Sequence, residues 1–132
     1  MVEGKPEAGA RVGLDTTVYF PSASPAPAIL LAHGFGGSKT RLASQAVSLA
    51  GLGYVVLTYT ARGFGRSGGL IHLDAPSYEV ADASLLISYL ATLPQVLKDA
   101  SGDPRVGVAG SSYGGGLALL LGTLFGWFGD VI

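Results

Sequence analysis

The sequence predicts an α/β fold in which helices cover both faces of a mostly parallel sheet. Segments with the pattern of strands alternate with segments of helical pattern along the chain. Residues 28–34 (AILLAHG) form a continuous apolar run, which is typical of a strand buried on both faces. Hydrophobic residues make up 48% of the 132 residues and charged residues only 13%, as expected for a sheet enclosed between helical layers.

The first strand is predicted over residues 11–22, where apolar and polar residues alternate as in a half-buried strand. The residues of its inner face are Val12, Leu14, Thr16, Val18 and Phe20. A connector punctuated by prolines, SASPAPA, then leads to the buried strand over residues 28–34.

The next two elements are a helix over residues 39–51 and a strand over residues 54–60. The helix is indicated by apolar residues that recur on one stripe, namely Leu42, Ala46, Leu49 and Ala50. Gly51 and Gly53 supply its stop signals. The loop that follows the strand, ARGFGRSGG, is too rich in glycine for regular structure.

The remaining elements are a helix over residues 77–93, a strand over residues 105–110 and a helix from Gly114 to about Phe128. The first of these helices has apolar residues near helical period, namely Tyr78, Ala81, Leu85, Ile87, Leu90 and Leu93. Pro94 ends it, and a turn, SGDP, precedes the strand. No repeat or long linker interrupts the chain, so we expect one domain.

Composition excludes several classes of function. The net charge is −1 and no basic block is present, so neither nucleic acid nor an anionic membrane surface is an expected partner. The absence of cysteine excludes disulfides, thiolate metal sites and cysteine nucleophiles. No metal and no organic cofactor is implied.

A cytoplasmic location is expected from the absence of targeting signals. The first 13 residues lack the apolar core of a signal peptide. The most apolar run, Leu117 to Phe128, is about 12 residues long, whereas a membrane span needs roughly 20. We interpret this run as a buried helix.

Two serines lie in the motif G-x-S-x-G, and their contexts differ. A nucleophile elbow requires a strand immediately before the serine and a helix immediately after it. Ser112 follows the strand RVGVAG and precedes the apolar segment GGLALLL, whereas Ser67 has a loop on both sides. Side chains two residues before or after the nucleophile would collide with neighbouring backbone, which explains Gly110 and Gly114. Ser112 is therefore the candidate nucleophile, and Ser67 is interpreted as a loop residue with local hydrogen bonds.

Two glycine-rich segments resemble nucleotide-binding motifs without meeting their requirements. Residues 63–68 spell G-x-G-x-x-G with Asp82 about 20 residues on, but a proline intervenes before any helix, and Asp82 lies within the helical segment. The segment HGFGGSKT has His33 and Ser38 where a phosphate-binding loop needs glycine. Lys39 is interpreted as a solvated lysine at a helix start.

The loop after the second strand supports the reading of Ser112 as a nucleophile. Acyl transfer develops negative charge on a carbonyl oxygen, which fixed backbone N–H groups stabilise. One donor would be the N–H of Tyr113, next to Ser112. The other would be the N–H of Phe35 in the glycine-rich loop His33–Gly37.

Three motifs in this order resemble the α/β-hydrolase fold: HGFGGSK, YTARGFGRSGG and PRVGVAGSSYGGGLAL. They are most similar to the acyl-esterase and X-Pro dipeptidyl-peptidase group, which includes the cocaine-esterase-like hydrolases. The match runs from about Arg11 to Leu121, and the tail, residues 122–132, diverges. The resemblance implies a serine hydrolase that cleaves small ester or peptide substrates through an acylated Ser112, with oxyanion N–H groups from Phe35 and Tyr113.

The sequence departs from this family in its catalytic acid and base. In the fold, an acid and then a histidine follow the nucleophile. After Ser112 the chain has one acid, Asp130, and no histidine. His33 begins the oxyanion loop, where a structural role is more common, and nothing in the sequence orients His72 toward Ser112. We therefore expect a partial α/β-hydrolase domain with its C-terminal strands missing, weak or inactive by itself.

Two readings from other classes stay open. The strand over residues 105–110 would be internal in the intact fold, so its exposed edge could make the chain a non-catalytic binding or dimerisation module. The other reading is a nucleotide-binding protein that uses HGFGGSKT.

Overall fold

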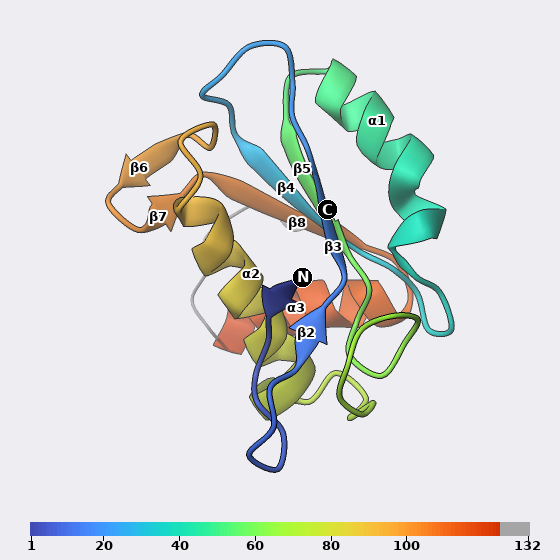
Figure 1. The fold of residues 1–132 in the computed structure, drawn as a ribbon. Coiled ribbons are helices and arrows are strands. Elements are labelled where there is room, and N and C mark those ends of the chain that lie inside the picture. Colours follow the sequence, from blue (N-terminus) through green and yellow to red (C-terminus); the bar gives the residue numbers. More distant parts are fainter. Residues whose placement is uncertain (125–132) are drawn as a thin grey trace.

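The central element is a four-stranded sheet, seen here in a computed structural model that describes residues 1–124 (Figure 1). The strand order is β3-β5-β4-β8. The strands are β3 (Thr16–Tyr19), β5 (Val55–Tyr59), β4 (Ala28–Ala32) and β8 (Val106–Gly110). β4 runs parallel to both β5 and β8, and β3 pairs antiparallel with β5. The sheet is thus mostly parallel, as the alternating pattern predicted.

Helices cover both faces of this sheet. On one face lies α1 (Ala43–Gly51), preceded by a 3-10 turn, η1 (Lys39–Leu42). The opposite face is covered by α2 (Ala81–Ala91), which follows a π-helical turn, η2 (Pro76–Val80), and by α3 (Tyr113–Leu124) (Figure 1). Every residue of β4 and β5 is buried, because these two strands lie inside both layers.

The register of the parallel strands gathers three loops at one edge. Ala32 at the end of β4 lies opposite Tyr59 of β5 on one side and Gly110 of β8 on the other. The loops that begin after these three residues therefore leave the sheet side by side. This edge holds Ser112 and the two predicted oxyanion residues, Phe35 and Tyr113.

The N-terminal strand is shorter than predicted. Residues 11–22 divide at Asp15 into β2 (Gly13–Leu14), which pairs with β1 (Val2–Glu3), and β3. Phe20 lies outside both strands and is 49% exposed, so its assignment to the inner face was wrong. A small hairpin, β6 (Lys98–Ala100) and β7 (Asp103–Pro104), was not predicted; its turn is the predicted SGDP segment.

The apolar stripes of two helices were predicted with different success. In α1, Ala46 is buried and Leu42, Leu49 and Ala50 pack beside it, as expected. In α2, Leu85 is 41% exposed and Leu86 is buried in its place. The buried face of α2 is formed by Ala83, Leu86, Ile87 and Leu90, which follow the spacing i, i+3, i+4 and i+7. Ile87 and Leu90 are buried as predicted, whereas Leu85, two residues before Ile87, does not fall on this face.

The last helix begins at Tyr113, one residue earlier than predicted, and is described up to Leu124. The predicted end at Phe128, residues 125–132 of the divergent tail and Asp130 lie outside the described residues. Within residues 1–124, no helix combines the length and the apolar character that crossing a membrane requires.

Candidate active site

Ser112 occupies the sharp turn between β8 and α3. Its φ is +55°, a left-handed conformation that is uncommon for any residue other than glycine. Backbone strain of this kind costs of order 1–3 kcal/mol and persists where the surrounding structure imposes it. The residue is exposed, so the turn presents its hydroxyl to solvent at the carboxyl edge of the sheet.

Two glycines allow this turn because backbone passes very close to them. A Cβ atom built on Gly110 would lie 2.4 Å from the carbonyl carbon of Gly114. A Cβ on Gly114 would lie 2.4 Å from the carbonyl oxygen of Ala32, at the end of β4. Neither contact can relax by rotating a side chain, since both involve backbone. The steric reason inferred for glycine two residues before and after Ser112 is confirmed.

The loop after β4 makes a tight turn next to the elbow. The N–H of Gly37 donates to the carbonyl oxygen of Gly34 at 3.0 Å, and Gly36 has a φ of +78°, which is a type II pattern that favours glycine at the third position. Phe35 is the second residue of this turn. Among residues 1–124, no acceptor is bonded to the N–H of Phe35 or to that of Tyr113, so both donors remain available.

The two expected oxyanion residues are brought together by their side chains. The ring of Phe35 meets the ring of Tyr113 edge to face, with centroids 5.5 Å apart, and meets Phe64 in the same manner at 5.1 Å. Such pairs contribute about 0.5–1.5 kcal/mol beyond their buried area. Phe35 is nevertheless 60% exposed, so the cluster presents an aromatic surface beside Ser112.

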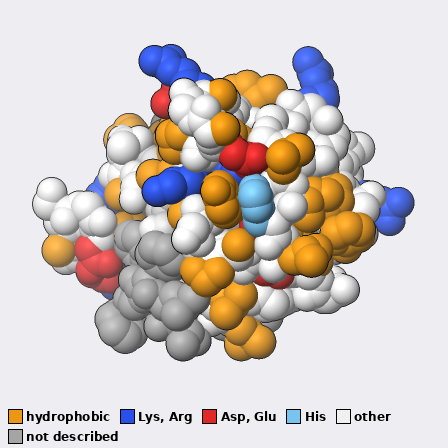
Figure 2. Space-filling model, turned by 90° about the horizontal axis from the view of Figure 1, so that it is seen from below, with side chains coloured by type: hydrophobic (Ala, Val, Ile, Leu, Met, Phe, Trp, Pro, Cys, Tyr) orange, Lys and Arg blue, Asp and Glu red, His pale blue; other side chains and the backbone are white. Residues whose placement is uncertain are grey.

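The surrounding face is rich in apolar side chains (Figure 2). Leu70, Ile71 and Leu73 belong to the loop before η2, and their exposed fractions are 65%, 37% and 72%. The small cavity beneath the elbow, in contrast, measures about 10 Å³, roughly the room that one water molecule needs. In the described part of the chain, the open side of Ser112 is therefore this apolar surface and not the cavity.

His33 serves the structure of the loop. It is 4% exposed, and its Nε2 accepts a hydrogen bond of 2.9 Å from the N–H of Ala61. Its Nδ1 therefore carries the proton, which it donates to the carbonyl oxygen of Gly34 at 2.7 Å. Both ring nitrogens are occupied, which confirms the structural role and excludes His33 as the base for Ser112 in this arrangement.

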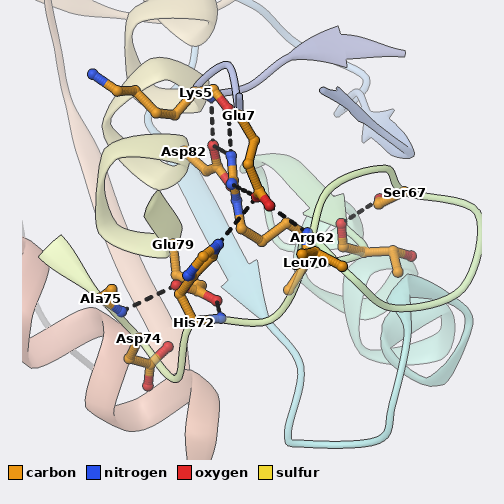
Figure 3. A network of polar contacts seen from close by, with 12 residues as sticks. Lys5, Glu7, Arg62, Ser67, Leu70, His72, Asp74, Ala75, Glu79 and Asp82 are labelled. Atoms are coloured by element: carbon orange, nitrogen blue, oxygen red, sulfur yellow. Dashed lines mark hydrogen bonds and ion pairs between the residues drawn. The ribbon is translucent and has the colours of Figure 1, made fainter. Parts of the chain in front are cut away.

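His72 is held by other partners as well. Its Nε2 donates to Glu7 Oε1 at 3.1 Å, and its ring stacks on Tyr78 with centroids 3.7 Å apart. These contacts direct the imidazole toward the N-terminal segment (Figure 3). The structure therefore does not bring either histidine into a hydrogen bond with Ser112.

A buried arginine connects the loops of this edge. The Arg62 side chain is fully buried, and its Nε and Nη2 donate to the two carboxylate oxygens of Asp82 at 2.7 Å and 3.0 Å. Nη1 donates to Glu7 at 2.9 Å, and Nη2 also donates to the carbonyl oxygen of Lys5 (Figure 3). Asp82 lies in the first turn of α2, as predicted, but it binds an arginine rather than a ribose.

Asp74, like Arg62, has an environment that the sequence did not predict. Leu73 and Asp74 both have positive φ values, +56° and +55°. Asp74 Oδ1 is buried without a hydrogen-bond partner in the described part of the chain. Burial and the nearby charge of Glu79 raise the pKa of Asp74 to about 6. No motif marks this residue, because its environment is created by α3, which follows about 40 residues later.

Two other residues differ from their predicted surroundings. Lys39 is partly buried and paired: its Nζ lies 2.7 Å from Asp15 Oδ1 and 2.9 Å from Thr17 Oγ1, so it ties η1 to the edge strand. Ser67 does lie in a loop, but its hydroxyl donates to the carbonyl oxygen of Thr60 and accepts from the distant N–H of Asp15. Neither residue is free to bind phosphate or act as a nucleophile.

The fold and the elbow together define the α/β-hydrolase class. The structure resembles Est1E of Butyrivibrio proteoclasticus, solved with ferulic acid bound, with a TM-score of 0.71 and 20% identity, covering 90% of this chain and 46% of that one. A probable hydrolytic enzyme of Pseudomonas aeruginosa PAO1 gives a TM-score of 0.76 at 21% identity, over 96% of this chain and 37% of the other.

The family follows from the sequence comparison. The model of the X-Pro dipeptidyl-peptidase family (S15) matches residues 9–124, and the chain belongs to this family. It is 34% identical over 111 residues to the uncharacterized protein YcjY of Escherichia coli, which covers 80% of this chain. It is 32% identical over 118 residues to a monoacylglycerol lipase of Mycolicibacterium smegmatis, covering 89%. The chain spans 35% and 39% of the length of these two relatives.

The contact of Gly114 with β4 predicts a large loss of stability in Gly114→Ala. Overpacking of this kind typically costs about 1–3 kcal/mol and here displaces α3 from Ala32. Gly51→Ala, at the end of α1 with no atom within 4 Å of its Cβ, is expected to keep or raise stability. Urea unfolding measures both, and equal midpoints for the two variants would contradict the steric account.

The raised pKa of Asp74 predicts a pH dependence of stability. The folded-state value of about 6 exceeds the ordinary value of about 3.9, so the folded protein holds this proton more tightly. The free energy of unfolding should therefore fall as pH rises from about 4 through about 6. Asp74→Asn should remove this decline in urea titrations across that range, whereas Asp103→Asn in the exposed hairpin should preserve it.

Proposed function

We propose that this chain supplies the nucleophile and the oxyanion hole of a serine hydrolase that cleaves small ester or amide substrates. The observation on which this rests is the exposed Ser112 at positive φ, in a strand-to-helix turn that only glycine neighbours permit. The N–H groups of Phe35 and Tyr113, which have no acceptor among residues 1–124, support the proposal, since an oxyanion needs such donors.

The chemistry follows from these groups. Ser112 Oγ would bond to the substrate carbonyl carbon while its proton passes to a base, and the carbonyl oxygen would gain negative charge between the N–H groups of Phe35 and Tyr113. Collapse of this intermediate would expel the alcohol or amine with that proton and leave an acyl-serine, which water hydrolyses. Both histidines have other partners, so the base must come from outside the described residues, and residues 1–124 alone would be weak or inactive.

The neighbouring surface supports apolar acyl groups as substrates. Phe35, Leu70 and Leu73 are exposed apolar residues of the loops around the elbow. The names of relatives point both to esters, in the monoacylglycerol lipase, and to peptides, in the family name. The proposal therefore covers both ester and amide substrates, and its test is made on Ser112 itself.

Labelling with a fluorophosphonate tests the nucleophile directly. In the protein at its full natural length we expect stoichiometric labelling, lost in Ser112→Ala and retained in Ser67→Ala. Mass spectrometry of the labelled peptide identifies the serine. Absence of labelling in a protein that circular dichroism shows to be folded would contradict the proposal.

A second candidate function is association through the sheet. In the described part of the chain, β8 pairs only with β4, so one edge of β8 has no strand partner. Such an edge is a template for pairing with another strand. The chain would then act as a binding or dimerisation module without chemistry of its own.

Size-exclusion chromatography with light scattering tests this second candidate. The mass of the 132-residue chain should rise above that of the monomer with increasing concentration. A monomer mass at every concentration would rule out self-association through this edge.

A further inference from the structure

Glu79 is a buried carboxylate at the centre of a group of donors. Only 3% of the residue is exposed. Its Oε2 accepts from the N–H of His72 at 2.6 Å and from the hydroxyl of Tyr113 at 3.2 Å, and its Oε1 accepts from the N–H of Ala75 at 3.0 Å. No cation lies within ion-pair distance of Glu79 in residues 1–124, because Arg62 is bound to Asp82 and Glu7. The charge is thus held mainly by neutral donors.

The same donors define the loop before η2 (Figure 3). Leu73 and Asp74 have positive φ values, which non-glycine residues adopt only when their surroundings require it. Glu79 accepts from the residues on either side of this pair, and the hydroxyl oxygen of Tyr113 accepts from the N–H of Asp74 at 3.1 Å. Glu79 and Tyr113 together therefore fix the strained loop.

Tyr113 connects this loop to the nucleophile. It directly follows Ser112, and its N–H is a proposed oxyanion donor. Burial raises the pKa of Tyr113, so its hydroxyl keeps the proton that it donates to Glu79. Its ring lies against Phe35, the other proposed donor, at 5.5 Å. One side chain thus contacts Glu79 at its hydroxyl and the second oxyanion residue at its ring.

We infer that Glu79 is a positioning residue for the oxyanion hole, acting through the hydroxyl of Tyr113. This inference rests on the proposed function. Glu79 touches neither substrate nor nucleophile; it fixes the side chain of Tyr113 and thereby the direction of the Tyr113 N–H and the place of Phe35. Through its hydrogen bonds, the Glu79 carboxylate also connects the loop that carries Leu70 and Leu73 to the side chain of Tyr113.

We expect loss of these contacts to lower the maximal rate at which Ser112 is labelled and to leave the affinity for the probe unchanged. Removing a whole oxyanion donor costs about 10²–10³-fold, so a donor that remains but is loosely held should lose roughly tenfold. Tyr113→Phe removes only the hydroxyl and keeps the ring against Phe35. Glu79→Gln keeps the size of the side chain but places an amide among N–H donors. Tyr54→Phe, which removes a hydroxyl at the other end of β5, is the matched control.

The experiment measures fluorophosphonate labelling and amide hydrogen exchange in the protein at its full natural length. We expect the maximal labelling rate to fall roughly tenfold in Tyr113→Phe and Glu79→Gln, with the half-saturating probe concentration unchanged and Tyr54→Phe like wild type. The N–H of Asp74 should exchange faster in Tyr113→Phe. Because both changes disrupt one unit, the double variant should lose little more than either single variant.

Two other outcomes overturn the inference in different ways. Faster exchange at Asp74 with wild-type labelling rates would mean that Glu79 holds only the loop, while the proposed function stands. A folded wild-type protein that is never labelled would refute the proposed function, and the positioning role with it. A fall of the labelling rate in Tyr54→Phe as well would show that the effect is not specific to the Tyr113 hydroxyl.

Discussion

The arrangement of the carboxyl edge depends on the buried guanidinium of Arg62. Its two-pronged contact with Asp82 ties the loop after β5 to α2, and its contacts with Glu7 and Lys5 bring the N-terminal segment to the same place. A buried charge is tolerated only when several groups compensate it, and removing one partner of such a pair typically costs about 3–5 kcal/mol. Glu7 then reaches His72, so the same contacts account for the orientation of that imidazole.

A second constraint sets the geometry of the nucleophile. The first turn of α3 approaches the end of β4 so closely that only hydrogen fits on the Gly114 Cα. This approach brings Tyr113 and Phe35 together from segments almost 80 residues apart, and it leaves Ser112 exposed above them. The candidate nucleophile and both proposed donors therefore depend on one packing contact between a helix and a strand.

The acids of this edge divide into two kinds. Asp82 and Glu7 compensate Arg62, whereas the Glu79 carboxylate accepts from backbone N–H groups and from the Tyr113 hydroxyl. Asp74 lies in the same loop, where its backbone N–H donates to Tyr113 and its Oδ1 has no hydrogen-bond partner among residues 1–124. The first pair stabilises the fold of the loops. The second pair lies where a change in charge or hydrogen bonding would be transmitted to Tyr113, which is why the proposed positioning role falls on Glu79.

The sequence by itself determined the alternation of strands and helices and the order of the three glycine-rich loops, and it singled out Ser112 as the candidate nucleophile, since these follow from local periodicity and short motifs. Only tertiary structure decided the roles of Arg62, Asp74 and Glu79, because their partners lie between 4 and 57 residues away and no local pattern encodes such pairings. Two errors show the limit of local patterns: Leu85 does not fall on the buried face of α2, which Ala83, Leu86, Ile87 and Leu90 form, and Lys39 pairs with Asp15, 24 residues earlier. Periodicity predicts which apolar residues share one face of a helix or strand. A buried polar contact, in contrast, forms only when distant segments pack against each other.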